Sequence, residues 1–151
     1  MYPDTQVEKQ LKTLGIITWA MLVAAPVIYL LIANFISAGM QAQAGNELIL
    51  YLLLLVAVVE PAMAPVMEWS QVQSYKAKPQ TDMKPINLFF TLSVMKMATV
   101  GAVYIFGFVV FILTGKFVNM LFFYPIGVAW TLVLWPKREK YEQLVERLNQ
   151  P

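Results

Sequence analysis

A chain of 151 residues, of which 59% are hydrophobic and only 13% are charged, carries more apolar surface than a soluble domain of this size can bury. Its net charge of +2 is spread over short segments between apolar runs, which argues against a nucleic-acid-binding surface. The sequence has no Cys and no His, which excludes disulfides, thiolate nucleophiles, serine–histidine catalysis and the usual zinc, haem and iron–sulfur sites. We therefore expect a membrane protein with no metal centre and no cofactor.

Four apolar runs dominate the chain, at residues 14–38, 48–69, 86–114 and 117–135. Each is close to or longer than the about 20 residues that a helix needs to cross about 30 Å of hydrocarbon. The second run begins as almost unbroken Leu, Val, Ile, Ala and Tyr, whereas a membrane β-barrel would show alternating polarity. The sequence predicts an all-α integral membrane protein, with residues 1–151 forming a single domain of four transmembrane helices in an up-down bundle.

Lysine and arginine predict the orientation of these helices, because short cytoplasmic segments collect both residues. They occur before residue 14, in the segment 70–85 and in the tail 136–151, whereas the segment 39–47 has none and 115–116 has one. The first run exceeds the about 7–15 apolar residues of a signal-peptide core, so we expect a retained helix. Both termini and the middle loop should then be cytoplasmic, in a multi-pass protein that we assign to a bacterial plasma (inner) membrane.

The tail 136–151 predicts an amphipathic cytoplasmic helix. Tyr141, Leu144 and Leu148 recur at helical spacing, and charged side chains occupy the opposite face. Two interpretations follow. The helix lies on the membrane surface, or it docks onto a partner subunit.

Two ionisable side chains fall deep inside the predicted spans, Glu60 in the second and Lys96 in the third. A charge at the centre of a bilayer costs about 2.5–3.5 kcal/mol, so neither side chain is expected to face lipid. Both lie a similar distance from the cytoplasmic ends of their predicted spans, which in an antiparallel pair brings them to nearly the same depth. We predict that Glu60 and Lys96 approach each other between the second and third helices.

Several polar groups could support this pair. Pro61 and Pro65 have no backbone N–H, which leaves carbonyls of the second helix free to accept hydrogen bonds. Ser93 and Thr99 lie on either side of the lysine along the third helix, broadly on one face, and Tyr29 adds a hydroxyl at mid-membrane depth. The functional interpretation is an ion or proton site with movable pKa values. The structural interpretation is a buried ion pair that fixes the register of two helices.

These features favour a non-catalytic protein. We expect an accessory or structural subunit of a larger membrane complex, in contact with the lipid bilayer and with other membrane subunits or further copies of itself, and not with nucleic acid. The alternative is a small ion- or proton-coupled transporter or channel that uses Glu60 and Lys96. A third possibility is an intramembrane enzyme built on Glu60 and a nearby Tyr, for which the sequence contains no catalytic constellation.

Overall fold

A computed structural model of the protein describes residues 4–37, 39, 47–77 and 84–150. Helices account for 92% of these residues, which contain no strand. The prediction of an all-helical protein with four helices long and apolar enough to cross a membrane is therefore confirmed. These four candidate spans are Thr5–Ser37, Leu48–Ala77, Pro85–Thr114 and Phe117–Leu134.

The first candidate span contains a π-helical segment. It consists of α1 (Asp4–Trp19), η1 (Ala20–Ala24) and α2 (Ala25–Ser37). Pro26, near the start of α2, has no N–H to donate to the preceding turn, and the helix widens immediately ahead of it.

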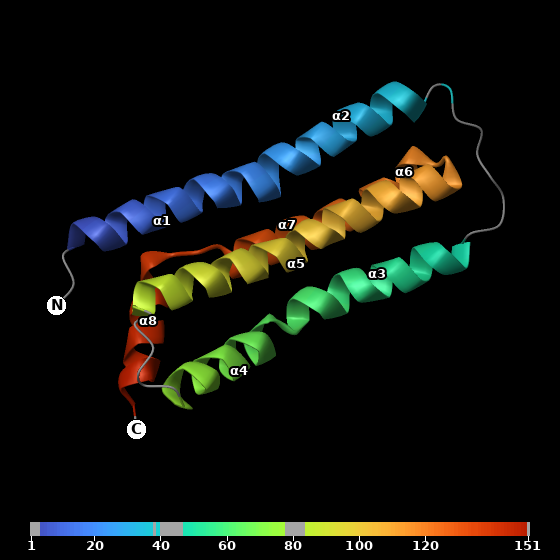
Figure 1. The fold of residues 1–151 in the computed structure, drawn as a ribbon. Coiled ribbons are helices and arrows are strands. Elements are labelled where there is room, and N and C mark those ends of the chain that lie inside the picture. Colours follow the sequence, from blue (N-terminus) through green and yellow to red (C-terminus); the bar gives the residue numbers. More distant parts are fainter. Residues whose placement is uncertain (1–3, 38, 40–46, 78–83, 151) are drawn as a thin grey trace.

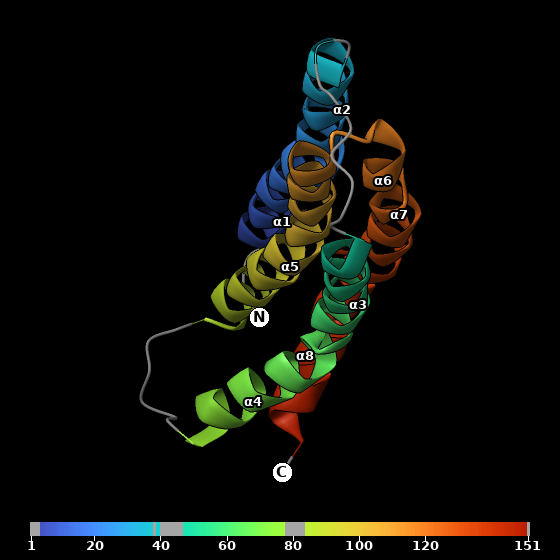
Figure 2. The ribbon, with the colours of Figure 1, turned by 90° about the vertical axis from the view of Figure 1, so that its right-hand side faces the viewer.

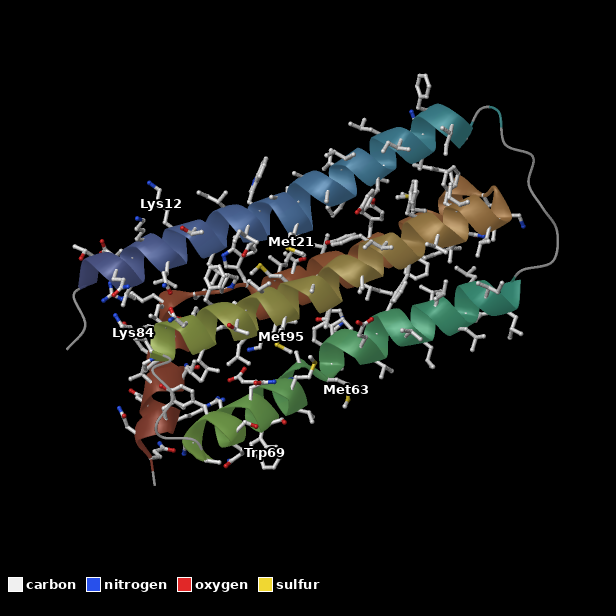
Figure 3. The ribbon with its side chains drawn as sticks, viewed as in Figure 1. Lys12, Met21, Met63, Trp69, Lys84 and Met95 are labelled. Carbon is white, nitrogen blue, oxygen red and sulfur yellow. The ribbon has the colours of Figure 1, made fainter. Side chains whose placement is uncertain are left out.

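The second candidate span is interrupted as well. A single residue separates helix α3 (Glu47–Ala62) from helix α4 (Ala64–Ala77). Pro61 and Pro65 flank this break, and neither can donate a hydrogen bond to the carbonyl four residues earlier. Met63, labelled in Figure 3, lies at the break between the two helices.

Helix α5 (Pro85–Thr114) is unbroken and contacts every other helical element. It ends at Gly115, whose φ of 65° is a left-handed conformation that favours glycine. The chain then continues through α6 (Phe117–Leu121) and α7 (Phe123–Leu134). In Figures 1 and 2, α5 and α7 form a central pair, with α1 and α2 along one side and α3 and α4 along the other.

The α5–α7 contact is close because Gly127 of α7 has no side chain. The ring of Tyr104 from α5 occupies the space where a Cβ of residue 127 would be. This ring is almost completely buried, and its hydroxyl lies 3.3 Å from Thr131 Oγ1. Gly107 of α5 allows a similar approach to Phe123. Small residues thus bring the two central helices together.

Large apolar side chains are exposed on all four candidate spans. Phe35 is 86% exposed, Leu48 71%, Ile105 47% and Leu132 72%. A soluble protein rarely leaves so much contiguous apolar surface in water, whereas hydrocarbon solvates it without cost.

The last helix, α8 (Arg138–Asn149), lies across the end of the molecule at which α1 begins (Figure 1). Its Leu144 is only 3% exposed, and the ring of Tyr141 meets Phe89 of α5 edge-on at 5.6 Å. Lys76 of α4 donates a hydrogen bond to the carbonyl of Gln150. The apolar face of the tail helix therefore packs against its own chain, a contact that neither sequence-based interpretation of this tail included.

Candidate functional site

A carboxylate shared by two cations is the best-defined polar feature of the protein. Glu68 of α4 forms an ion pair through Oε2 with Lys96 Nζ of α5, and its Oε1 accepts a hydrogen bond of 3.0 Å from Arg147 Nη1 of α8. The side chains of Glu68 and Lys96 are only 20% and 21% exposed, whereas Arg147 is 60% exposed. One acidic group thus joins three helices that are far apart in the sequence.

This ion pair differs from the predicted one. The sequence argument assumed that Trp69 marks the cytoplasmic end of the second helix, but α4 continues to Ala77. Counted from the helix ends that the structure gives, Glu68 lies level with Lys96, and Glu60 lies two turns farther along the helix. The structure therefore does not bring Glu60 and Lys96 together as a pair.

Three of the other residues predicted near Lys96, namely Thr99, Ser93 and Pro65, lie beside it. Thr99 Oγ1 donates a hydrogen bond of 2.8 Å to the carbonyl oxygen of Lys96. Ser93 is buried, and Ser93 and Pro65 both line a cavity next to the Glu68–Lys96 pair. The expected clustering of Ser93 and Thr99 with Lys96 is thus present, with Glu68 as the acidic partner.

The cavity has a volume of about 250 Å³ and lies between α4, α5, α8 and the end of α7. Its polar lining includes three cationic side chains, Lys96, Lys140 and Arg147, and one carboxylate, Glu68. Apolar side chains such as Leu134 complete the wall. Figure 3 shows nitrogen- and oxygen-bearing side chains meeting in this region between α4, α5 and α8.

Lys140 lies in this cavity at the end of α7. Its Nζ donates a hydrogen bond of 2.6 Å to the carbonyl oxygen of Val133, which satisfies one of the free carbonyls at the end of α7. Burial lowers the pKa of Lys140, and the nearby charges of Lys96 and Lys137 lower it further, while Glu68 acts in the opposite direction. The cations of this cavity are therefore crowded and incompletely neutralised.

Glu60, Pro61 and Tyr29 lie away from this cluster. Glu60 is partly buried on α3, and its carboxyl group forms no hydrogen bond or ion pair with any residue that the structure describes. Pro61 is fully buried, and Tyr29 stacks on Phe108 with ring centroids 5.5 Å apart. Glu60 thus stays an isolated carboxyl group within an apolar helix.

The level of the Glu68–Lys96 ion pair divides each of the first three candidate spans into two parts. Thr18 of α1 contacts Met97, the residue after Lys96. The same level is therefore marked by Thr18 on the first span, by Glu68 on the second and by Lys96 on the third. From it, an apolar segment of about 18 to 20 residues remains on each span, or about 27–30 Å. Glu60 lies about 12 Å inside that segment, measured along its helix from Glu68.

The sequence argument missed Glu68, Arg147 and Lys140. None of the three was singled out as a candidate site residue from the sequence. A usable signal was present, because Lys140, Leu144 and Arg147 recur at helical spacing and so share one face. The sequence also did not predict a contact between α7 and α2, in which the hydroxyl of Tyr124 donates a hydrogen bond of 2.7 Å to the carbonyl oxygen of Pro26.

Comparisons of the chain with protein-family models, curated proteins and solved structures found no match. Among the described residues, no three acidic side chains gather in a way that could hold a metal ion. The arrangement therefore offers two features for interpretation. One is the cationic cavity around Glu68, and the other is the isolated Glu60.

Proposed function

We propose that this chain is a non-catalytic accessory or structural subunit of a larger membrane complex. The observation that carries the proposal is Glu60, a carboxyl group in an apolar helix without a partner among the described residues. An ionisable side chain within a bilayer costs about 2.5–3.5 kcal/mol unless another group compensates it. A donor or cation from a neighbouring subunit, or from a second copy of this chain, compensates Glu60 in the assembled complex.

The proposed membrane boundary runs through the level of Glu68 and Lys96. Beyond this level the apolar helical segments are about 27–30 Å long, which agrees with a hydrocarbon thickness of about 30 Å. On this placement the four helices cross in up-down order, and Glu60 lies within the hydrocarbon. The start of α1, the end of α4, the start of α5 and all of α8 extend beyond it.

The lysines and arginines support a cytoplasmic location for these extensions. The end of the molecule that holds Lys12, Lys76, Lys84 and Arg147 is the more basic one, whereas the α5–α6 turn carries only Lys116. By the positive-inside rule both termini are cytoplasmic, and a bacterial inner membrane is the host that we propose. Helices that pack against one another beyond the membrane also provide a surface for larger subunits.

The decisive experiment is to replace Glu60 and to follow assembly. In Glu60→Leu the carboxyl group is lost, so the chain should still fold and insert but should leave its complex during extraction in mild detergent. Glu8→Gln, which removes an exposed carboxylate from α1, serves as the control and should leave the particle mass unchanged. A Glu60→Leu variant that stays in a particle of unchanged mass and composition would contradict the proposal.

The alternative function is a small ion- or proton-coupled transporter or channel. It is favoured by the break at Met63, because interrupted helices expose carbonyls that can bind a cation, and Glu60 lies next to this break. Lys96 contributes less than expected to such a path, since Glu68 pairs with it. Loss of ion flux in Glu60→Gln vesicles, with assembly unchanged, would support transport over the accessory role.

A further inference from the structure

We propose that the cavity bounded by Lys96, Lys140 and Arg147 binds a phosphate group, supplied by the headgroup of an anionic phospholipid. This proposal does not depend on the accessory role, because it concerns a separate cavity and a ligand rather than a subunit. It rests on the excess of cations in the lining, on unused hydrogen-bond donors, on the volume and on the position of the cavity.

The lining charges are unbalanced. Glu68 neutralises one of the three cations, so the cavity keeps an excess of positive charge. Because Lys96 and Lys140 are partly withdrawn from water, the repulsion between their charges is less screened than on an open surface. A bound anion would relieve this repulsion.

Hydrogen-bond donors stay available after the internal contacts are satisfied. An ammonium group has three N–H donors and a guanidinium has five. Lys140 uses one donor on the carbonyl of Val133, and Arg147 Nη1 contacts Glu68. Lys140 and Arg147 can therefore still donate several charge-assisted hydrogen bonds to the oxygens of a phosphate, and the hydroxyl of Ser93 and the amide of Gln143 also line the cavity.

The volume and position favour a lipid over a free ion. About 250 Å³ equals the share of liquid volume of roughly eight water molecules, which leaves ample space for a phosphate with part of its glycerol. One wall is apolar and includes Leu134, the last residue of the fourth candidate span. On the proposed membrane placement, a headgroup in the cavity leaves its acyl chains beside the apolar segments of the helices.

The test is native mass spectrometry of the intact protein in detergent, titrated with phosphatidylglycerol or with phosphatidylcholine of the same acyl chains. We expect phosphatidylglycerol to bind about tenfold more tightly, because the choline ammonium of phosphatidylcholine offsets the charge of its phosphate and is repelled by the cationic lining. The preference should disappear in Lys140→Gln/Arg147→Gln. It should persist in Lys12→Gln/Lys116→Gln, which removes the same charge at exposed positions, and Figure 3 shows Lys12 pointing away from the other helices.

Two further measurements separate the possible outcomes. Lys140→Gln alone leaves the contacts of Glu68 intact, so a weaker lipid preference in this variant supports the site even if the double variant does not fold. Protection against thermal unfolding by inorganic phosphate, without any preference between the two lipids, would support the phosphate site but assign it to a soluble ligand. Equal binding of both lipids, with no effect of inorganic phosphate on thermal unfolding, would overturn the proposal. An equal loss of the preference for phosphatidylglycerol in the two double variants would overturn it as well.

Discussion

Replacing Gly127 by Ala should loosen the central helix pair. A Cβ added at this position would lie 2.5 Å from Cζ and 2.6 Å from Cε1 of Tyr104. The ring cannot retreat easily, because it is almost fully buried and meets Tyr124 edge-on at 5.3 Å. Overpacking of this kind costs about 1–3 kcal/mol, and the better helix propensity of Ala returns at most about 1 kcal/mol. We expect a net loss of about 1–2 kcal/mol in the free energy of unfolding.

The matched control is Gly101→Ala in α5. Nothing lies within 4 Å of a Cβ at Gly101, so this variant keeps the gain in helix propensity without a clash. Both variants should be measured by denaturant titration in the same detergent, with helix content followed by circular dichroism. If Gly127→Ala unfolds at the same denaturant concentration as Gly101→Ala or at a higher one, the described contact between α5 and α7 is wrong.

Three further predictions concern polar contacts. Glu68→Gln leaves two cations without their carboxylate and should lower the free energy of unfolding by about 1–3 kcal/mol, whereas Glu142→Gln, which breaks an exposed pair, should cost no more than about 0.5 kcal/mol. Tyr124→Phe removes the hydrogen bond to the carbonyl of Pro26 and should cost about 0.6 kcal/mol, the average for such bonds between membrane helices. The pKa of Lys140 is lowered in the folded protein, so the unfolded chain binds this proton more tightly. The free energy of unfolding should therefore rise as the pH increases from the lowered pKa to 10.5, the ordinary pKa of a lysine. The melting temperature of Lys140→Gln should lack this rise, and a rise equal to that of the wild type would contradict the assigned perturbation.

The helical architecture could be predicted because it depends on the length and apolarity of continuous segments. Residues 86–114, for example, contain one lysine and no acidic residue, and only a helix satisfies the backbone of such a segment in hydrocarbon. The structure describes a helix at Pro85–Thr114. Proline at its first position and glycine immediately after its last residue gave clear boundaries.

The acidic partner of Lys96 could not be predicted from span lengths. Apolarity indicates where a helix can enter the membrane, but a helix can continue into water, as α4 does up to Ala77. The assumed boundary at Trp69 shifted the expected depth by about two turns and selected Glu60 in place of Glu68. The error therefore arose from the helix end, and the structure pairs Lys96 with Glu68 in place of the predicted Glu60.

The packing of α8 against its own chain also could not be predicted from the spacing of its apolar residues. An amphipathic helix has the same spacing of apolar residues whether it covers lipid, a partner or its own protein. What decides the outcome here is the extension of α4 and α5 past the apolar segments, which gives Leu144 a surface to cover. The cationic cavity is a consequence of the same extension, because it forms where α8 meets these helices.

The most direct test of the proposed function is the mass and composition of the particle that contains this chain after extraction from its native membrane in mild detergent. The accessory role predicts a defined complex with other chains in fixed ratio, which releases the Glu60→Leu variant as a folded monomer. Recovery of the wild-type chain only as a free monomer, with the same mass as Glu60→Leu, would contradict it.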